Sequence, residues 1–261
     1  MERVFDDQAA AALGLSVGDC VVLIHTGSRG LGHQVCTDYV KQMDAVMRRH
    51  EIRIPDRELA CAPFDSPEGK RYFAAMCAAA NFAFANRQAI THAVRKAFRS
   101  VVGKDVTLRL VYDVTHNMAK LEQHGRQRLV VHRKGATRAF GPSHPETPAR
   151  YRAIGQPVLI PGSMGTASYV LVGTDAALER SFGSCCHGAG RAMSRGAAKR
   201  VQSGPDVRRA LEAKGILVVG AGNQELAGRR PTPTRTWTGW WTWCTRRGSP
   251  GKWRGSSLWG C

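Results

Sequence analysis

Several apolar runs of this chain end in glycine-rich turns, and this alternation limits the folds that it can adopt. The run CVVLIH leads into TGSRGLG, QPVLIP leads into GSMGT, and a further run, ILVVG, ends in glycine. Short apolar runs bounded by turn residues indicate buried strands, and the longer alanine-rich stretches between them favour helices. The pattern predicts a mixed α/β or α+β domain whose functional residues gather at the turns that follow strands.

The expected elements follow one another along residues 1–226. We expect strands at residues 20–25, 106–114, 128–132, 156–161, 168–174 and 216–220. We expect helices at residues 33–50, 71–99 and 205–214, and a glycine-rich turn that enters a helix at 184–195. A further helix is expected to begin at His116. No internal repeat is visible, so the chain is not expected to be a solenoid.

The composition indicates a folded domain with a polyanionic partner. The 261 residues are 43% apolar and 22% charged, which is enough apolar material for a sizeable core. The formal net charge of +18 points to nucleic acid or a nucleotide as the partner. The eight cysteines are too sparse for a disulfide scaffold and lack zinc-finger spacing, and the sequence has neither a membrane-spanning run nor a signal-peptide core. We therefore expect a cytoplasmic protein with reduced thiols and no membrane contact.

The last residues of the chain differ from the rest in composition. All six tryptophans lie between Trp237 and Trp259, and no acidic residue follows Glu225. Such a stretch is compatible with a basic, aromatic arm that binds nucleic acid. Because tryptophan has a single codon, however, a shifted reading can be worked out between Trp240 and Thr245, and it gives the acidic, apolar series Val-Asp-(Val/Leu/Met)-Val-(His/Tyr). We predict that residues 227–261 form an aberrant, disordered, basic and tryptophan-rich tail produced by a frameshift.

Two histidines follow expected strands. His25 opens HTGSRGLG, where glycines let the backbone approach a ligand and Arg29 offers a planar donor fork suited to phosphate. The neutral imidazole of His116 in YDVTHN could ligate a metal, with Asp113 or Glu122 near enough to hydrogen-bond its other nitrogen. The structural alternatives are a core-facing His25 at a tight turn and a His116 that caps its own helix.

Two further turns have the composition of phosphate sites. PGSMGTASY combines consecutive backbone N–H groups with hydroxyls, which can cradle an anion, although an ordinary hairpin turn is the alternative. In CCHGAGR, glycines after His187 leave room for a phosphorus atom to reach its imidazole, and Arg191 can stabilise developing negative charge. Cys185 and Cys186 are competing nucleophile candidates, or structural residues of the core.

Together these segments resemble one family. The segments that carry the resemblance are, in order, HTGSRGLGHQV, IPDRELACAPFDSPEG, NFAFANRQAI, YDVTHNMAKLEQH, VHRKGATRAFGP, PGSMGTASYVLVG and CHGAGRAMSR. They are similar to successive motifs of the RtcB RNA ligases, in order over about residues 1–225. The resemblance implies an α+β catalytic domain of mixed sheets with helices at residues 1–226, truncated on its N-terminal side. It also implies a GTP- and Mn²⁺-dependent enzyme of tRNA splicing and RNA repair. Such an enzyme joins RNA 3′-phosphate or 2′,3′-cyclic phosphate ends to 5′-hydroxyl ends through a histidine–GMP intermediate.

The resemblance also assigns roles to individual residues. His187 would be the catalytic nucleophile with Arg191 beside it, and His25 and His116 would be ligands of Mn²⁺, of which the family holds two. The guanine nucleotide would lie against Asn117, Pro161, Gly162, Ser163, Met164, Ser168, His187, Gly188, Ala189 and Gly190. The partners would be GTP, RNA in the form of tRNA halves or broken strands, and an activating protein of unknown identity. We expect His25, His116 and His187 to converge on one cleft.

Two departures from the family leave the activity of this chain open. The family carries an Asp-x-Gly-Cys-Gly and a Gly-Asn-His metal motif in its N-terminal half, and Gly18-Asp19-Cys20 does not replace them because it lacks that order and spacing. The family also closes with an acidic stretch and a Lys-Gly terminus, which the shifted frame resembles and the tail does not. The chain is therefore either an RNA ligase polypeptide that holds the guanylylated histidine, or an inactive remnant that at most binds nucleotide or RNA.

Overall fold

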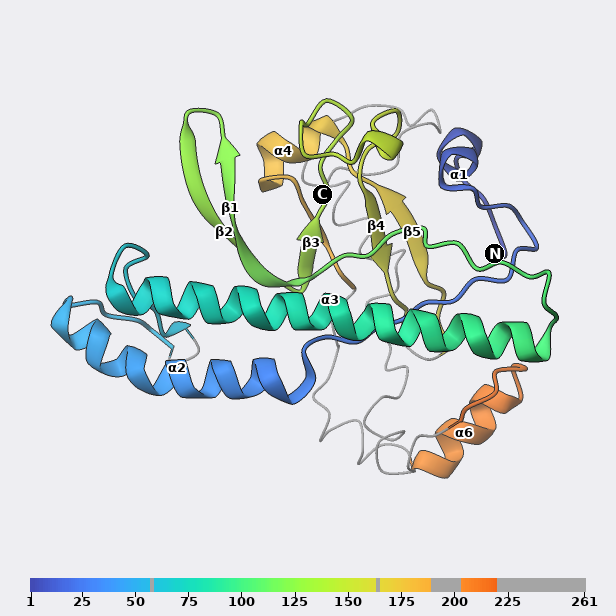
Figure 1. Ribbon diagram of the computed structural model, residues 1–261, viewed down its shortest axis with the longest axis horizontal. Helices are drawn as coiled ribbons and strands as arrows, with labels where there is room; N and C mark the ends of the chain where they lie inside the picture. Colours follow the sequence, from blue (N-terminus) through green and yellow to red (C-terminus); the bar gives the residue numbers. More distant parts are fainter. Residues whose placement is uncertain (57–58, 163–164, 189–202, 220–261) are drawn as a thin grey trace. The chain divides into compact units, whose positions relative to one another are not determined.

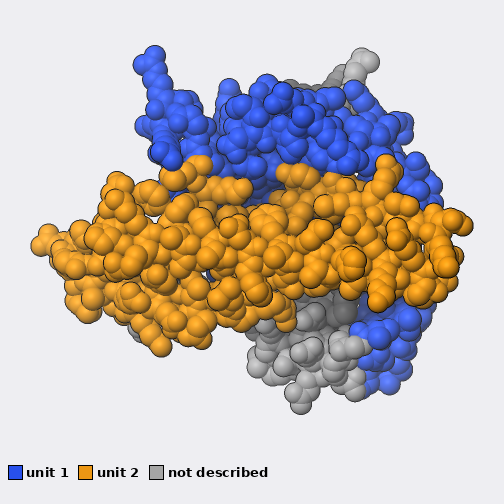
Figure 2. All heavy atoms as spheres, in the orientation of Figure 1, with its two compact units in different colours: residues 1–20, 122–261 blue, residues 21–121 orange. Residues whose placement is uncertain are grey.

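The computed structural model describes residues 1–56, 59–162, 165–188 and 203–219 (Figure 1). These residues fall into two compact units, which Figure 2 shows in different colours. Residues 21–121 form the first, called the helical unit below. Residues 1–20 and the described residues from 122 onward form the second, called the sheet unit. Each unit is described by itself.

The helical unit is built on two long helices, α2 (Arg29–Arg49) and α3 (Pro67–Val101), which run antiparallel (Figure 1). Two residues that can be recognised in the sequence, Ser66 and Pro67, mark the start of α3. The hydroxyl of Ser66 accepts a hydrogen bond from the backbone N–H of Gly69 at 3.1 Å, and Pro67 occupies the first turn, where its missing N–H costs nothing. The helix therefore begins where its cap and its proline place it.

Packing between α2 and α3 combines apolar, aromatic and charged contacts. The apolar side chains that α2 buries are Met43, Val46 and Met47, and α3 offers the small buried residues Ala79 and Ala83. The rings of Tyr39 and Tyr72 lie 5.3 Å apart, and Arg49 forms an ion pair with Glu68 at 3.0 Å. Alanine on one helix and long side chains on the other let the two backbones approach closely.

The sheet unit contains short strands in two-stranded sheets. Strand β3 (Ala136–Arg138) pairs antiparallel with β6 (Ser184–Cys186), and β4 (Pro157–Ile160) pairs antiparallel with β5 (Tyr169–Val172). Strand β1 (Asn117–His124), which begins in the helical unit, pairs with β2 (Gln127–Lys134). The helical elements of the sheet unit are α1 (Asp7–Leu13), η2 (Ala149–Tyr151), α4 (Asp175–Ser181) and α6 (Gly204–Glu212).

A small apolar core joins the two antiparallel sheets of the sheet unit. Its buried members come from β4, from β6 and from the end of β3: Ala139, Val158, Ile160 and Cys185. Tyr169 and Leu171 of β5 pack against them. Because successive side chains of a strand alternate between faces, Val158 and Ile160 share the inner face of β4. This core fixes β6, the strand that leads to His187.

The expected class, mixed helices with sheets, is confirmed as helices combined with small antiparallel sheets. The helices expected at 33–50, 71–99 and 205–214 correspond to α2, α3 and α6, and the strands expected at 128–132, 156–161 and 168–174 correspond to β2, β4 and β5. These elements need only local signals, such as a cap, an apolar period or a nearby hairpin partner.

Three expected strands were wrong: residues 20–25, 106–114 and 216–219 form no strand. A strand requires a neighbour that completes its hydrogen-bond ladder, and none of the described strands pairs with these segments. None of their apolar side chains is fully buried, and some are largely exposed, at 54% for Val21, 49% for Leu110 and 81% for Leu217. An apolar run indicates a tendency to be buried, which is only one of the two conditions for a strand.

The helix expected to begin at His116 was also wrong, because strand β1 begins at Asn117. Gly125, whose φ of +58° lies in the left-handed region, closes a tight turn that pairs β1 with β2. At residues 184–195, the expected turn begins instead with strand β6, which finds its partner in β3. In both places pairing with a second segment overrides the local preference.

Some expectations fall outside the described residues. The helix expected after residue 188 and the tail at residues 227–261 both lie there. The single domain expected at residues 1–226 stays a prediction. In the part of the chain that the structure describes, no helix is both long enough and apolar enough to span a bilayer.

A glycine in the sheet unit gives a test of this packing. Gly155 has a φ of +94°, and a Cβ there would lie 2.1 Å from the carbonyl oxygen of Gly173. We expect Gly155→Ala to lower the free energy of unfolding by about 1–3 kcal/mol beyond the left-handed strain of about 1–2 kcal/mol, because the backbone itself must move. Gly125→Ala is the matched control, since its φ is also positive but its Cβ would meet nothing within 4 Å. Urea unfolding with equal losses for both variants would contradict the clash.

Candidate functional site

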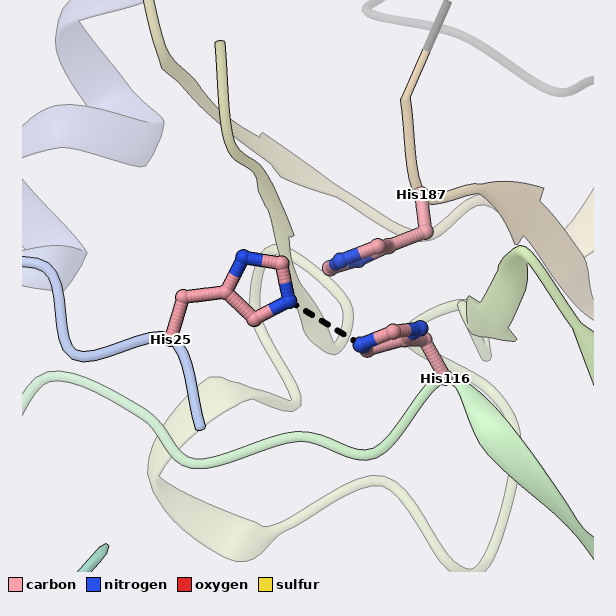
Figure 3. A group of neighbouring side chains, drawn as sticks. All are labelled: His25, His116 and His187. Carbon is pink, nitrogen blue, oxygen red and sulfur yellow. Dashed lines mark hydrogen bonds between the residues drawn. The ribbon is translucent and has the colours of Figure 1, made fainter. Parts of the chain in front are cut away.

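Two histidines of the helical unit lie against each other although 91 residues separate them in the chain. The Nε2 atoms of His25 and His116 are 3.1 Å apart, and the two rings meet edge to face at 72° (Figure 3). Figure 3 also draws His187, which belongs to the sheet unit. Two imidazole nitrogens at this separation either share one proton or direct both lone pairs at one cation, since nitrogens about 2.0–2.1 Å from a shared cation lie roughly 3 Å apart.

Helix α3 holds the loop that carries His25. The side-chain amide of Asn86 donates to the carbonyl oxygen of Gly27 at 2.9 Å, and Nη1 of Arg87 donates to the carbonyl oxygen of Thr26 at 3.2 Å. The same guanidinium donates through Nε to Asp113 at 2.6 Å. Asp113, one of the two carboxylates that we expected to hydrogen-bond His116, is therefore bound by an arginine.

The surroundings of His116 favour its neutral form. Burial lowers the pKa of His116, and the nearby His25 and Arg87 lower it further, whereas a hydrogen bond with Asn117 opposes them. The neutral ring keeps one nitrogen lone pair free for a proton or a cation near pH 7. Asn117 itself is exposed at the first position of β1.

His187 lies in the sheet unit, directly after β6. Its backbone N–H donates to the carbonyl oxygen of Gly135 at 2.9 Å, which extends the pairing of Ala136 with Cys186 by one step. The histidine is therefore attached to the end of a paired strand, and Gly188 after it has open space where a Cβ would stand. That this glycine lets a ligand approach His187 stays a prediction.

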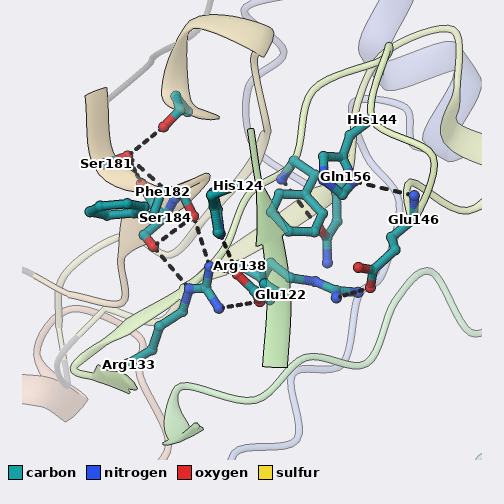
Figure 4. Close-up of polar contacts among 12 residues, drawn as sticks. Glu122, His124, Arg133, Arg138, His144, Glu146, Gln156, Ser181, Phe182 and Ser184 are labelled. Carbon is teal, nitrogen blue, oxygen red and sulfur yellow. Dashed lines mark hydrogen bonds and ion pairs between the residues drawn. The ribbon is translucent and has the colours of Figure 1, made fainter. Parts of the chain in front are cut away.

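A buried ion pair holds the start of β6 in place (Figure 4). Arg133 donates to both carboxylate oxygens of Glu122, at 2.6 and 2.8 Å, and its remaining donors reach Ser184 Oγ and the carbonyl oxygen of Phe182 at 2.9 Å. Burial alone would raise the pKa of the Glu122 carboxyl, but the bonds from Arg133 and His124 hold it below its ordinary value. The carboxylate stays charged, and Arg133 ties β2 to the first residue of β6.

The adjacent thiols on β6 differ in their surroundings. Cys185 is buried in the core, as the structural interpretation expected. The hydrogen bond with the Cys185 side chain lowers the pKa of the Cys186 thiol, with a smaller lowering from the backbone of Gly188, while burial opposes both. Neither thiol forms a disulfide with another described residue.

The loop between β4 and β5 is compact. The backbone N–H of Gly162 donates to the hydroxyl of Ser168 at 2.9 Å, and a Cβ at Gly162 would lie 2.4 Å from the carbonyl oxygen of Ala167. The exposed Ser168 and the half-buried Pro161 flank this turn. The expected nucleotide residues of this loop therefore lie together on the surface of the sheet unit, apart from two that are not described.

Several expected site residues lie outside the described residues. They are Ser163, Met164, Ala189, Gly190 and Arg191. Their assignment as nucleotide-binding or catalytic residues stays a prediction, as does the convergence of His187 with the histidine pair.

Inspection of the residues alone gave no role to three side chains that organise these segments. Asn86 and Arg87 were present in the segment NFAFANRQAI and Arg133 in VHRKGATRAFGP, but no role followed from the residues themselves. For Arg87 the available signal was a lone charge in the stretch of α3 between Arg71 and Arg95, since a cation on an apolar helix is buried only when it is paired. For Arg133 the strand gave no such signal, because Arg128 and Lys134 lie on it as well.

The two imidazoles lie close enough to act together as ligands of a transition-metal cation. The chain therefore falls in the class of helix-and-sheet proteins with a candidate metal site. Comparison with known families makes the class more specific. Residues 1–233 match the sequence model of the family described as "tRNA-splicing ligase RtcB". The chain belongs to this family.

Curated relatives agree with the family match. The tRNA-splicing ligase RtcB of Archaeoglobus fulgidus is 54% identical over 238 residues, which cover 88% of this chain and 49% of the relative. The protein of the same name from Methanococcus maripaludis is 53% identical, covering 84% of this chain and 47% of the relative. The RNA-splicing ligase RtcB of Mycobacterium bovis is 52% identical, covering 88% of this chain and 54% of the relative. This chain thus spans about half the length of these relatives.

The buried ion pair behind β6 can be tested by removing one partner. We expect Arg133→Met to lower the free energy of unfolding at pH 7 by about 3–5 kcal/mol, because it leaves the charged Glu122 buried without its main partner. Arg209→Met is the control, since Arg209 pairs with Asp206 at the surface, and it should change the free energy of unfolding little.

The pH dependence of this pair has a definite sign. Because the folded-state pKa of Glu122 is lowered, its stabilising contribution is present above the ordinary carboxyl pKa and is lost as the pH falls through the folded value. The difference between wild type and Arg133→Met should therefore shrink in acid. Urea unfolding at pH 7 and at pH 4 measures it, and a difference that stays constant would show that Glu122 is not the group responsible.

Proposed function

We propose that this chain carries the nucleotide-transfer half of an RNA ligase that joins RNA 3′-phosphate or 2′,3′-cyclic phosphate ends to 5′-hydroxyl ends, as in tRNA splicing and RNA repair. The observation that carries the proposal is the juxtaposition of His25 and His116 at 3.1 Å in a chain of this family. GTP and Mn²⁺ would be the cofactors. The finer fold assignment, an RtcB-like catalytic domain, belongs to the same proposal.

The donor set of the histidine pair fits a divalent transition-metal ion. The two Nε2 atoms lie 3.1 Å apart, which is about the separation of two nitrogen ligands of one cation, and burial keeps His116 neutral. His25 and His116 would therefore hold Mn²⁺, whose charge would neutralise the triphosphate of GTP when the ion is bound. Metal-binding groups from the other half of the family fold would complete its coordination.

The proposed nucleophile is His187. Its imidazole nitrogen would attack the α-phosphorus of GTP, forming a nitrogen–phosphorus bond as pyrophosphate leaves, and Arg191 would stabilise the charge that develops. The loop residues Pro161, Gly162 and Ser168, with Asn117, would position the nucleotide through N–H and hydroxyl groups. We propose that His187 acts in one reaction centre with His25 and His116.

The proposed RNA partner accords with the charge of the chain. The formal net charge is +18, and a polyanion gains affinity from each cation that replaces a counterion on its phosphates. The second candidate function is a remnant that binds nucleotide or RNA without catalysis. The observation that favours it is that these 261 residues contain neither the Asp-x-Gly-Cys-Gly nor the Gly-Asn-His motif.

We further propose that residues 227–261 come from a shifted reading frame. All six tryptophans fall within this range, whereas the family match ends at residue 233. The nucleotide sequence around this segment decides between a frameshift and a basic, aromatic arm. Amide exchange protection of the segment equal to that of residues 106–114 would support the arm.

Covalent labelling tests the proposed reaction. We expect that the 261-residue chain alone does not acquire GMP from radiolabelled GTP and Mn²⁺, because the metal ligands of the other half are missing. Supplying that half and the shifted C-terminal frame should restore labelling, and His187→Ala in the restored protein should abolish it. His92→Ala on the exposed side of α3 is the control and should label normally. Denaturing electrophoresis reads the outcome.

Two results would contradict the proposal in different ways. Label on the isolated chain would show that the missing ligands are dispensable. Label that survives His187→Ala would show that another residue is the nucleophile, with Cys186 the first alternative to test.

A further inference from the structure

Arg87 connects the two segments that carry His25 and His116. Its Nη1 donates to the carbonyl oxygen of Thr26, the residue after His25, at 3.2 Å. Its Nε donates to Asp113, three residues before His116, at 2.6 Å. One rigid planar group therefore bridges two segments that are far apart in sequence, and all of these residues belong to the helical unit.

The guanidinium of Arg87 is held in one orientation. The residue is 8% exposed, and its guanidinium carbon lies 4.6 Å from the centre of the Phe84 ring, one turn earlier on α3. Its Nη2 atom is buried without a hydrogen-bond partner among the described residues. Two hydrogen bonds and the ring contact therefore leave this planar group little rotational freedom.

We propose that Arg87 is a positioning residue that sets the separation of the His25 and His116 ring nitrogens. Its neighbour Asn86 contributes by fixing the carbonyl of Gly27, two residues after His25, at 2.9 Å. Without the bridge, each histidine would move with its own loop, and the 3.1 Å approach would be lost. The inference rests on the proposed function in that the pair is taken as a metal site.

Lysine cannot replace this bridge. Arg87 uses two different nitrogens for two acceptors that lie in different segments, and the planar fork fixes the angle between them. An ammonium group is a point charge that can satisfy Asp113, but it does not impose the geometry of the second contact. Arg87→Lys should therefore keep most of the stability and lose the positioning.

The matched control lies two turns further along α3. Nε of Arg95 donates to the carbonyl oxygen of Leu108 at 2.9 Å, so it also ties the helix to the segment that leads to His116. Among the described residues, Arg95 forms no hydrogen bond with the loop of His25. Arg95→Gln thus removes an arginine bridge of the same kind without touching the proposed one.

The first measurement uses the metal-free 261-residue chain. Long-range ¹H–¹⁵N NMR of ring-labelled histidine reports the tautomer of each imidazole, with His25→Gln and His116→Gln providing the assignments. In the wild type the short Nε2–Nε2 contact requires one ring to donate and the other to accept, so two fixed tautomers are expected. Arg87→Gln and Arg87→Lys should give averaged signals, and Arg95→Gln should give the wild-type pattern.

The second measurement is Mn²⁺ binding by calorimetry on the same proteins. We expect Arg87→Gln and Arg87→Lys to weaken binding about 10- to 100-fold, the usual cost of losing a group that orients metal ligands. Arg95→Gln should stay near the wild-type value. If the wild type binds no Mn²⁺, the metal part of the proposed function fails, while the tautomer signals still test the positioning of the pair.

Folding is checked on every variant by urea unfolding. If Arg87→Gln does not fold, Arg87→Lys and Asp113→Asn keep the test open, because each preserves one half of the bridge. Unchanged tautomers in the folded Arg87 variants would overturn the proposal. An equal disturbance of the histidines in Arg95→Gln would also overturn it, since the effect would then be a general loosening of α3.

Discussion

A buried guanidinium paired with a carboxylate organises each unit. In the helical unit Arg87 binds Asp113 and the loop of His25, and in the sheet unit Arg133 binds Glu122 and the start of β6. Taking such charges out of water costs several kcal/mol per ion, and only a nearly complete set of fixed acceptors offsets this cost. Each arginine therefore binds acceptors on a segment that is distant in sequence. As a result, the segments that carry the histidines are anchored to these arginines.

The elements that could be predicted from sequence were those with local causes. Ser66 and Pro67 mark the start of α3, and the hairpin of β4 and β5 closes over a short glycine turn. Strand β3 was missed because a strand of three residues is too short to show an alternating pattern. Its partner β6 also lies more than forty residues later in the chain. Residues 20–25 were wrongly assigned because apolar character indicates only a tendency to be buried, whereas these residues are not buried and pair with none of the described strands.

The residues of the candidate site also fall into those that the sequence predicts and those that only the structure identifies. His25, His116 and His187 could be selected from sequence because an imidazole beside a glycine-rich or strand-ending turn is chemically distinctive. The residues that support them could not, since Asn86 and Arg87 act on carbonyl groups 59 and 61 residues away. Their chemistry is ordinary for a helix, and only the contact made after folding gives them a role. A long-range contact of this kind is visible in a structure and invisible in a residue pattern.

The interruption of the sheet unit by the helical unit has a consequence for the order of events at the ribosome. Helices α2 and α3 are neighbours in the chain, so their pairing can form as soon as residue 101 has left the exit tunnel. Residues 1–20, which are made before the helical unit, must wait for residues beyond 121 before their own unit can close. During that interval the acidic, alanine-rich segment of α1 is a nascent chain without its native neighbours. Translation pauses before residue 122 would prolong this interval without delaying the helical pair.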